Sequence, residues 1–154
     1  MKLTAKGRYA VTAMLDLAIR QATGSITLAD MAERQGISSS YLEQLFAHLR
    51  RAELVVSTRG PGGGYRLKRD PDEVSVFDVI HAVNETVDAR KCGGKANCHD
   101  NNRCLTHDLW EELSIKIDDF LREVSLGQLM REEGVKEIAG KQQAIQVKRQ
   151  LYSV

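Results

Sequence analysis

Two short helical segments joined by a turn that begins with a glycine constrain the fold of this chain more than any other feature. The first follows Thr27, a residue type that caps helices, and spans residues 28–35; it ends at Gly36, which can adopt left-handed backbone. Only two residues separate Gly36 from the second segment, in which Ser40 and Glu43 have capping-box spacing. The apolar residues of the second segment recur at helical steps, as Leu42, Leu45, Phe46 and Leu49. This pattern predicts a helix-turn-helix whose second helix has a polar outer face.

A glycine-rich hairpin follows these two segments. Residues 54–59 and 65–67 are typical of two strands, and residues 60–64, Gly-Pro-Gly-Gly-Gly, connect them. A glycine-rich loop could instead hold the phosphates of a nucleotide, but this one lacks the Lys-Ser/Thr ending of such loops and leads into a strand. The hairpin is therefore interpreted as a wing.

Charge is segregated along the chain although the net charge is only +1. Residues 1–69 carry 11 Lys and Arg against 5 Asp and Glu, whereas residues 70–133 carry 7 against 15. A basic half beside an acidic half indicates a polyanionic partner for the first half; the alternative is a solvated mosaic of charges.

The strongest helical pattern of the chain runs from residue 105 to residue 124. Its apolar members are Leu105, Leu109, Leu113, Ile117, Phe120, Leu121 and Val124. So wide a stripe on a late helix predicts pairing with the same helix of a second copy, and the alternative is packing against the chain's own first domain. The predicted fold class is mainly α with a small β-hairpin wing: a winged helix-turn-helix domain plus a long dimerisation helix.

These patterns divide the chain into four segments. Residues 1–85 are predicted to form the winged helix-turn-helix domain, and residues 86–104 a loop that holds a metal cluster. Residues 105–133 contain the dimerisation helix and a short C-terminal helix. Residues 134–154 are predicted to be a flexible tail, because they are largely polar.

Three cysteines and one histidine lie in or beside the loop. Five residues separate Cys92 from Cys98 and Cys98 from Cys104, and two separate Cys104 from His107. Since positions three apart share a helical face, Cys104 and His107 can point at one site, which the other two cysteines can complete from flexible backbone. Structural zinc sites usually pair ligands about two to four residues apart, whereas wider spacing suits a two-iron cluster. Thiolates and imidazole also bind zinc, so zinc remains the alternative.

The cysteines also indicate a compartment and exclude a class of protein. Three cysteines, no secretory layout at the N-terminus and no apolar run of about 18 residues predict a cytoplasmic protein without a membrane segment, in which thiols stay reduced. No Cys-x-x-Cys pair and no catalytic fold are evident, which disfavours a thiol redox enzyme or a metal carrier. We predict no catalytic residue.

Four stretches carry a resemblance that spans about residues 1–140: residues 3–11, residues 36–45, the hairpin loop 59–65, and residues 104–107, Cys-Leu-Thr-His. In these stretches the chain resembles the winged-helix family of iron-sulfur cluster regulators, which also includes nitric-oxide-sensing repressors. The hairpin loop is shared by many relatives, and the Cys-Leu-Thr-His motif is more specific.

The resemblance implies a homodimeric transcription factor that binds promoter DNA and represses or activates genes for iron-sulfur cluster assembly. It implies a [2Fe–2S] cluster, received from the assembly machinery and held by Cys92, Cys98, Cys104 and His107. Relatives that sense nitric oxide have a similar three-cysteine loop without the histidine, so His107 favours the assembly regulator.

The DNA contacts are expected on the second helix of the helix-turn-helix and on the wing. The expected residues are Ser38, Ser40, Tyr41 and Gln44 toward phosphates or base edges, and Arg59 in the minor groove beside Pro61 and Gly62. Glu43 differs from them, because its carboxylate can accept from a cytosine amino group but is repelled by phosphate and by guanine acceptors. It could therefore select among DNA sites by weakening binding to those that place a phosphate or a guanine beside it, or it could serve only as the capping-box acceptor.

Overall fold

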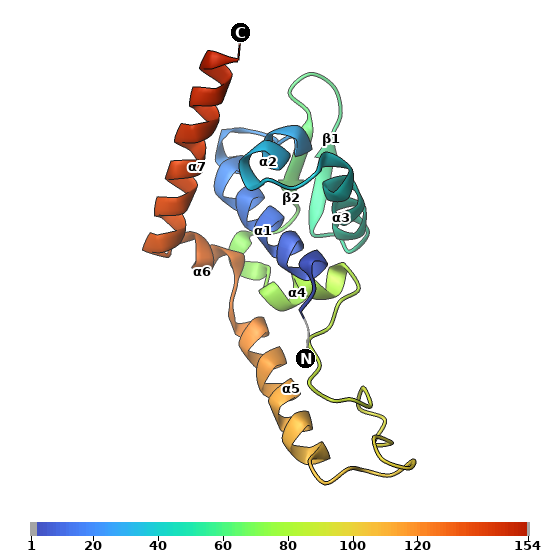
Figure 1. Cartoon of the computed structure of the whole chain (residues 1–154). Coiled ribbons are helices and arrows are strands. Elements are labelled where there is room, and N and C mark those ends of the chain that lie inside the picture. The colour runs from blue at the N-terminus through green and yellow to red at the C-terminus, as the bar shows by residue number, and fades with distance from the viewer. Residues whose placement is uncertain (1–2, 154) are drawn as a thin grey trace.

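The computed structural model describes residues 3–153 as a mostly helical chain with one small antiparallel hairpin (Figure 1). In chain order the elements are α1 (Ala5–Arg20), η1 (Gln21–Thr23), α2 (Leu28–Gln35), α3 (Ser39–Arg51), β1 (Val55–Thr58), β2 (Gly64–Leu67), η2 (Pro71–Glu73), α4 (Val76–Ala82), α5 (His107–Glu123), α6 (Leu126–Met130) and α7 (Glu133–Tyr152). Within residues 3–153, no helix combines the length and the apolar character that crossing a membrane requires.

Helix α2 begins and ends as the sequence predicts. The side chain of Thr27 accepts a hydrogen bond from the backbone N–H of Asp30, and Gly36 closes the helix in the left-handed conformation, at φ 65°. The same local logic holds at α4, where Ser75 and Asp78 form a complete capping box.

The predicted capping box of Ser40 and Glu43 is wrong. The N-cap of α3 is Ser38, whose side chain accepts from the backbone N–H of Tyr41. The residues before and after explain the choice, because Ile37 and Leu42 are both buried in the core at the positions of a hydrophobic staple. Glu43 thus has no capping role and lies exposed on the helix.

The hairpin forms in the predicted place. Strand β1 pairs with β2 in the register Val55 to Leu67 through Thr58 to Gly64, and Tyr65 also pairs with Ile26 in front of α2. A side chain at Gly64 would collide with the carbonyl group of Ile26, so this glycine allows the hairpin to lie directly against the helix-turn-helix.

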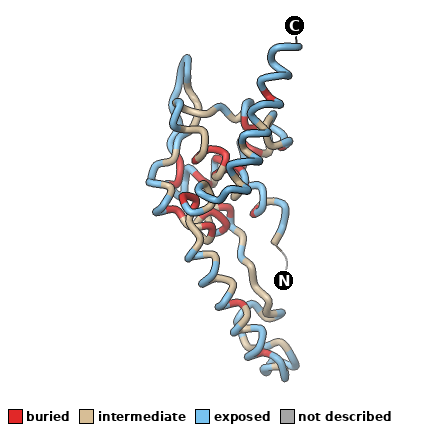
Figure 2. Tube along the Cα trace, turned by 90° about the vertical axis from the view of Figure 1, so that its left-hand side faces the viewer, coloured by how far each residue is buried: buried red, intermediate tan, exposed pale blue. Residues whose placement is uncertain are grey.

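One apolar core holds α1 to α4 and the hairpin together. Its largest fully buried side chains include Phe46, Met14, Leu17, Leu45 and Ile80. We call residues 3–83 the winged unit, because they contain this helix-turn-helix, the hairpin and all of the buried core cluster except Leu126 of α6 (Leu126–Met130). Figure 2 shows the buried residues gathered there.

A second region projects from the winged unit. It consists of an irregular segment, residues 84–106, and the long helix α5, and we call residues 84–123 the metal arm (Figure 1). The arm is tied back at the end of α5, where the backbone N–H of Val76 donates to the carbonyl of Val124 at 2.9 Å and that of Leu126 donates to the carbonyl of Val74 at 2.9 Å. The helix starts at His107, so Leu105 of the predicted stripe precedes it and is fully exposed.

The predicted flexible tail is instead a helix. Residues 133–152 form α7, which runs alongside the winged unit and contacts α2 (Figure 1). The prediction failed because α7 has no apolar stripe facing the core: its only buried residue is Gln146, and its docking is polar.

Candidate metal centre and DNA-reading face

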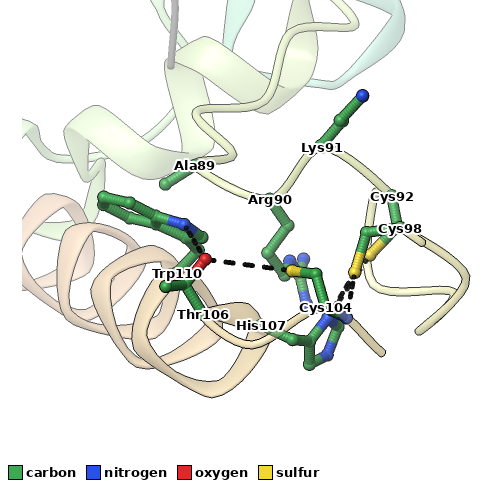
Figure 3. A pocket seen from close by; sticks show the side chains of 9 residues that line it. All are labelled: Ala89, Arg90, Lys91, Cys92, Cys98, Cys104, Thr106, His107 and Trp110. Atoms are coloured by element: carbon green, nitrogen blue, oxygen red, sulfur yellow. Dashed lines mark hydrogen bonds between the residues drawn. The ribbon is translucent and has the colours of Figure 1, made fainter. Parts of the chain in front are cut away.

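The irregular segment of the metal arm is shaped by tight turns. Gly93 and Gly94 adopt positive φ, as do Ala96, Asp100 and Asn101, which are not glycines. Backbone of this kind costs free energy and persists where the surroundings or a ligand require it. The turns bring Cys92, Cys98 and Cys104 to the start of α5 (Figure 3).

The imidazole of His107 lies at the centre of the donor group. Its side chain is only 3% exposed, and its Nδ1 lies 3.6 Å from Cys92 Sγ and 3.5 Å from Cys98 Sγ. The ligand atoms of these three residues all lie within 4.8 Å of one another. Its other ring nitrogen, Nε2, faces the carboxylate of Glu111 at 4.0 Å, one turn along α5. A carboxylate on the far side of a ligating histidine fixes the orientation of its ring.

Cys104 lies at the edge of this group. Its backbone N–H donates to Cys98 Sγ at 3.1 Å, and its own Sγ lies 3.9 Å from Thr106 Oγ1 (Figure 3). The backbone N–H of His107 donates to the Cys104 carbonyl at 3.2 Å, so the sequence Cys-Leu-Thr-His forms a turn at the helix start. The structure thus brings together three of the four predicted donors and places the fourth beside them.

The thiols influence one another's ionisation. Desolvation raises the pKa of Cys92, but backbone N–H groups within residues 94–97 lower it by more, so it ends below its ordinary value. The backbone N–H of Cys104 lowers the pKa of Cys98. The Cys104 thiol, desolvation and the neighbouring thiolates together raise this pKa by more, so it ends above its ordinary value. Hydrogen bonding to the Cys98 thiol lowers the pKa of Cys104. A cation among them would favour the thiolate form of all three.

The four donors line a cavity of about 300 Å³ beside α5. Arg90 and Lys91 also line it, as do the apolar side chains of Ala89 and Trp110. The cavity is much larger than one metal ion, and its cationic rim suits a ligand set rich in thiolates. The residues present therefore fit a small iron-sulfur cluster as well as a single ion.

A hydrogen-bonded frame that sequence reasoning missed holds the loop against α5. Ser114, 4% exposed, accepts from the backbone N–H of Ala89 at 2.9 Å and donates to Asp88 at 3.1 Å. Arg90 pairs with Asp88 at 2.9 Å and reaches Glu111 at 3.6 Å. The hydrogen bond from Arg90 lowers the pKa of Asp88 to about 2. The sequence shows only a serine among the charged residues of this helix, and its burial is known from the structure alone.

The predicted DNA-contacting residues of the helix-turn-helix lie on and beside α3. Ser38, Ser40, Glu43 and Gln44 are exposed. The side chain of Ser38 is engaged as the helix cap, and Tyr41 is half-buried with its ring edge-on to Tyr9, at 5.8 Å between ring centroids. Three predicted positions therefore present free polar side chains outward, whereas Ser38 and Tyr41 also stabilise the unit.

The predicted wing residues lie in the turn between β1 and β2. Arg59, Pro61 and Gly62 are all exposed there. Gly60 and Gly62 have φ values of 89° and 73°, a region that favours glycine, and a hydrogen bond from the backbone N–H of Gly63 to the carbonyl of Gly60 closes the turn at 2.8 Å. The turn holds Arg59 on the surface, away from the core.

Helix α5 exposes much of its predicted apolar stripe. Leu109 is 56% exposed and Phe120 is 63% exposed, whereas Leu113, Ile117 and Leu121 are partly buried. The half-buried Val124 ends the helix as its C-cap. Ile115, which the periodicity did not select, is also 54% exposed.

Comparison with known proteins identifies the family. The sequence model of the Rrf2 family, described as iron-dependent transcriptional regulators, matches residues 3–132. The chain belongs to the Rrf2 family. The match covers the winged unit, the metal arm and α6, and it ends immediately before α7.

Relatives described as the HTH-type transcriptional regulator IscR are similar over most of the chain. One from Photobacterium profundum is 59% identical over 145 residues, covering 94% of this chain and 84% of the relative. One from Vibrio cholerae is 57% identical over 142 residues, covering 92% and 82%.

Solved structures of Rrf2-type regulators share the fold. The structure of T. potens IscR has a TM-score of 0.73 and 36% identity, covering 87% of this chain and 90% of that one. The structure of CymR, the global cysteine regulator of B. subtilis, has a TM-score of 0.74 and 30% identity, covering 84% and 96%. The predicted winged-helix class and family resemblance are confirmed, and the chain is a DNA-binding transcriptional regulator, not an enzyme.

Proposed function

We propose that this Rrf2-family regulator senses an iron-sulfur cluster and controls genes for cluster assembly as a cytoplasmic homodimer. The observation that carries the proposal is the convergence of thiols on the buried imidazole of His107, within 3.6 Å for two of the three. The relatives described as IscR, more than half identical to this chain, support the same assignment.

The cluster we propose is of the [2Fe–2S] type, with Cys92, Cys98, Cys104 and His107 as its ligands. When bound, such a group supplies a metal-dependent link between the irregular loop and the start of α5. Arg90 and Lys91, on the rim of the cavity, balance the negative charge of the thiolates. Asp88 and Ser114 hold the loop where its sulfur atoms face α5.

On DNA, we assign direct contacts to the exposed side chains of α3 and to the wing. Ser40 and Gln44 are available for base edges and phosphates, and Arg59 for the minor groove beside Pro61 and Gly62. Glu43 is exposed on α3, so its carboxylate is available to discriminate among DNA sites. Ser38 and Tyr41 contribute mainly by holding α3 in place and secondarily by phosphate contact.

The partner for the exposed stripe of α5 is a second copy of this chain. An apolar helix face of this kind is stabilised when it pairs with its twin across a two-fold axis. Such a pair places the two metal arms together and leaves both winged units free to bind DNA. The cluster itself would come from donors of the iron-sulfur assembly machinery.

Anaerobic purification, followed by visible and electron paramagnetic resonance spectra with iron and sulfide analysis, tests the cofactor. We expect two irons and two sulfides per chain. Zinc alone, or the spectrum of a four-iron cluster, would replace this assignment with a zinc-stabilised or a nitric-oxide-sensing regulator. DNA titrations of the loaded and metal-free protein at one salt concentration test the sensing: equal affinities at every promoter would contradict it.

A further inference from the structure

Helix α7 is attached to the winged unit in an unusual way. It lies outside the part of the chain that the family match covers, which ends at residue 132. Its larger apolar side chains point mainly into solvent: Ile138 is 57% exposed, Ile145 52% and Leu151 69%. A cavity of about 170 Å³ lies between α1 and α7, so apolar packing along this seam is incomplete. Polar contacts must therefore hold the helix.

The polar contacts start from a buried carboxylate in α1. Asp16 has a side chain only 1% exposed, and Arg34 of α2 pairs with it through Nε at 3.0 Å and Nη2 at 2.8 Å. Gln35 donates to the same carboxylate at 2.8 Å. A buried charge requires such partners, because removing it from water without them costs several kcal/mol.

Five hydrogen bonds through two glutamines of α7 extend this network. Arg34 Nη1, which Asp16 does not engage, donates to Gln146 Oε1 at 3.1 Å. Gln146, 5% exposed, donates in turn to the carbonyl of Asp30 at 3.2 Å and to Glu33 at 3.1 Å. Gln35 and Gln142 exchange two amide hydrogen bonds, at 2.9 and 3.1 Å. One side chain, Gln146, thus contacts three residues of α2.

Helix α2 has few other restraints. Of its eight residues only Met31 is buried, with Leu28 and Ala32 half-buried at its edge. A short helix anchored by so little apolar surface depends on its polar contacts for its exact tilt. In a helix-turn-helix the first helix crosses the DNA backbone and sets how the second enters the groove.

We propose that α7 positions the DNA-reading helices, with Gln146 as the principal positioning residue acting through Arg34 and α2. The role is distinct from direct contact with DNA and requires no metal. The proposal requires only that the chain is a DNA-binding regulator. It can therefore be tested independently of the proposed cluster.

The test compares Gln146→Ala with Gln150→Ala, the same change at an exposed position of the same helix. The probe is a short DNA duplex that the wild-type chain selects from a random-sequence pool. It is titrated at several salt concentrations, at a temperature well below the melting temperature of each protein variant. We expect Gln146→Ala to bind about tenfold more weakly, with an unchanged dependence of affinity on salt, because no phosphate contact is lost. Gln150→Ala should bind as the wild type does.

Two results would overturn the proposal. A lower melting temperature with wild-type affinity would mean that the network only stabilises the fold. A shallower salt dependence would mean that α7 contacts phosphates directly. If Gln146→Ala does not fold, Gln142→Ala, which removes only the contact to Gln35, is measured in the same way and should show a smaller loss in the same direction.

Discussion

The winged unit and the metal arm are stabilised by different kinds of interaction. The winged unit buries large apolar side chains such as Phe46 and Met14 completely. The metal arm has only two buried residues on α5, His107 and Ser114, and both are polar. Its loop is held by ion pairs, a serine hydroxyl and left-handed turns. The winged unit is therefore stabilised mainly by its apolar core, whereas the proposed function makes the order of the arm depend on a bound metal and a partner chain.

This difference suits a sensor. A region whose order depends on something bound to it can report whether that ligand is present, because local opening of such a region costs little free energy. The region that reads DNA must keep its shape in both states.

Cys98→Ala should abolish stoichiometric metal binding while leaving the winged unit folded. Cys98 Sγ faces His107 and accepts from the backbone of Cys104, so its loss disconnects two other donors. Iron analysis after anaerobic reconstitution, with far-UV circular dichroism alongside, measures both. Retention of full iron occupancy would show that Cys98 is not a ligand, and loss of the entire helical signal would show that the two regions fold together.

Phe46→Ala and Phe120→Ala should differ sharply in their effect on stability. Phe46 is fully buried, and its truncation should lower the free energy of unfolding by about 3–5 kcal/mol. Phe120 is 63% exposed, so the same change should cost less than about 0.5 kcal/mol within one chain. Urea denaturation measures both. Sedimentation should show weaker self-association for Phe120→Ala alone. Similar free energies of unfolding for the two variants would contradict the expected difference between the winged unit and the metal arm.

Arg59→Ala should weaken binding at specific DNA sites by about 1–3 kcal/mol. Arg59 is exposed at the wing turn, far from the donor cavity. The loss should therefore be the same in the wild-type and Cys98→Ala backgrounds, since distant sites act additively. Arg131→Ala, at an exposed arginine paired with Asp72, is the matched control and should bind normally. Unchanged affinity of Arg59→Ala would exclude this residue from the interface.

Asp88 should make the metal arm sensitive to acid. Its pKa in the folded chain is about 2, below the ordinary value of 3.8, so the ionised carboxylate favours the folded state. That stabilisation is complete above about pH 4 and is lost as the pH falls toward 2. Allowing for its 24% exposure, we expect a contribution of about 1–2 kcal/mol at neutral pH.

The measurement uses the fluorescence of Trp110, the chain's one tryptophan, which lines the donor cavity. In the metal-free protein, Asp88→Asn should lower the denaturation midpoint reported by Trp110 at pH 6, and the difference should vanish near pH 2. A difference that persists in acid would assign the stabilisation to packing instead of charge.

Local sequence signals predicted the winged unit well. The caps at Thr27 and Ser75, the stop at Gly36 and the glycine-rich turn depend on residues within a few positions of one another. The convergence of Cys92, Cys98 and His107 could also be anticipated, because cysteines in a polar loop have few structural uses. These features need no knowledge of distant contacts.

Features that depend on tertiary contacts were missed. The cap of α3 was misplaced by two residues, since Ser38 and Ser40 look alike until Ile37 is known to be buried. Helix α7 was missed because it docks through Gln146 onto an arginine more than one hundred positions earlier. The frame around Asp88 likewise depends on Ser114, across the loop. Polar contacts over such separations leave no periodic pattern.

The backbone tie between Val76 and Val124 makes α5 a lever. The helix has 17 residues and is therefore about 25 Å long, with its fixed point at one end and His107 at the other. A tilt of about 10° at the tie displaces the histidine end by about 4 Å. A small change in the angle of α5 beside the winged unit thus corresponds to a large displacement at the donor cavity. A modest rearrangement at either end of the helix is therefore transmitted to the other end.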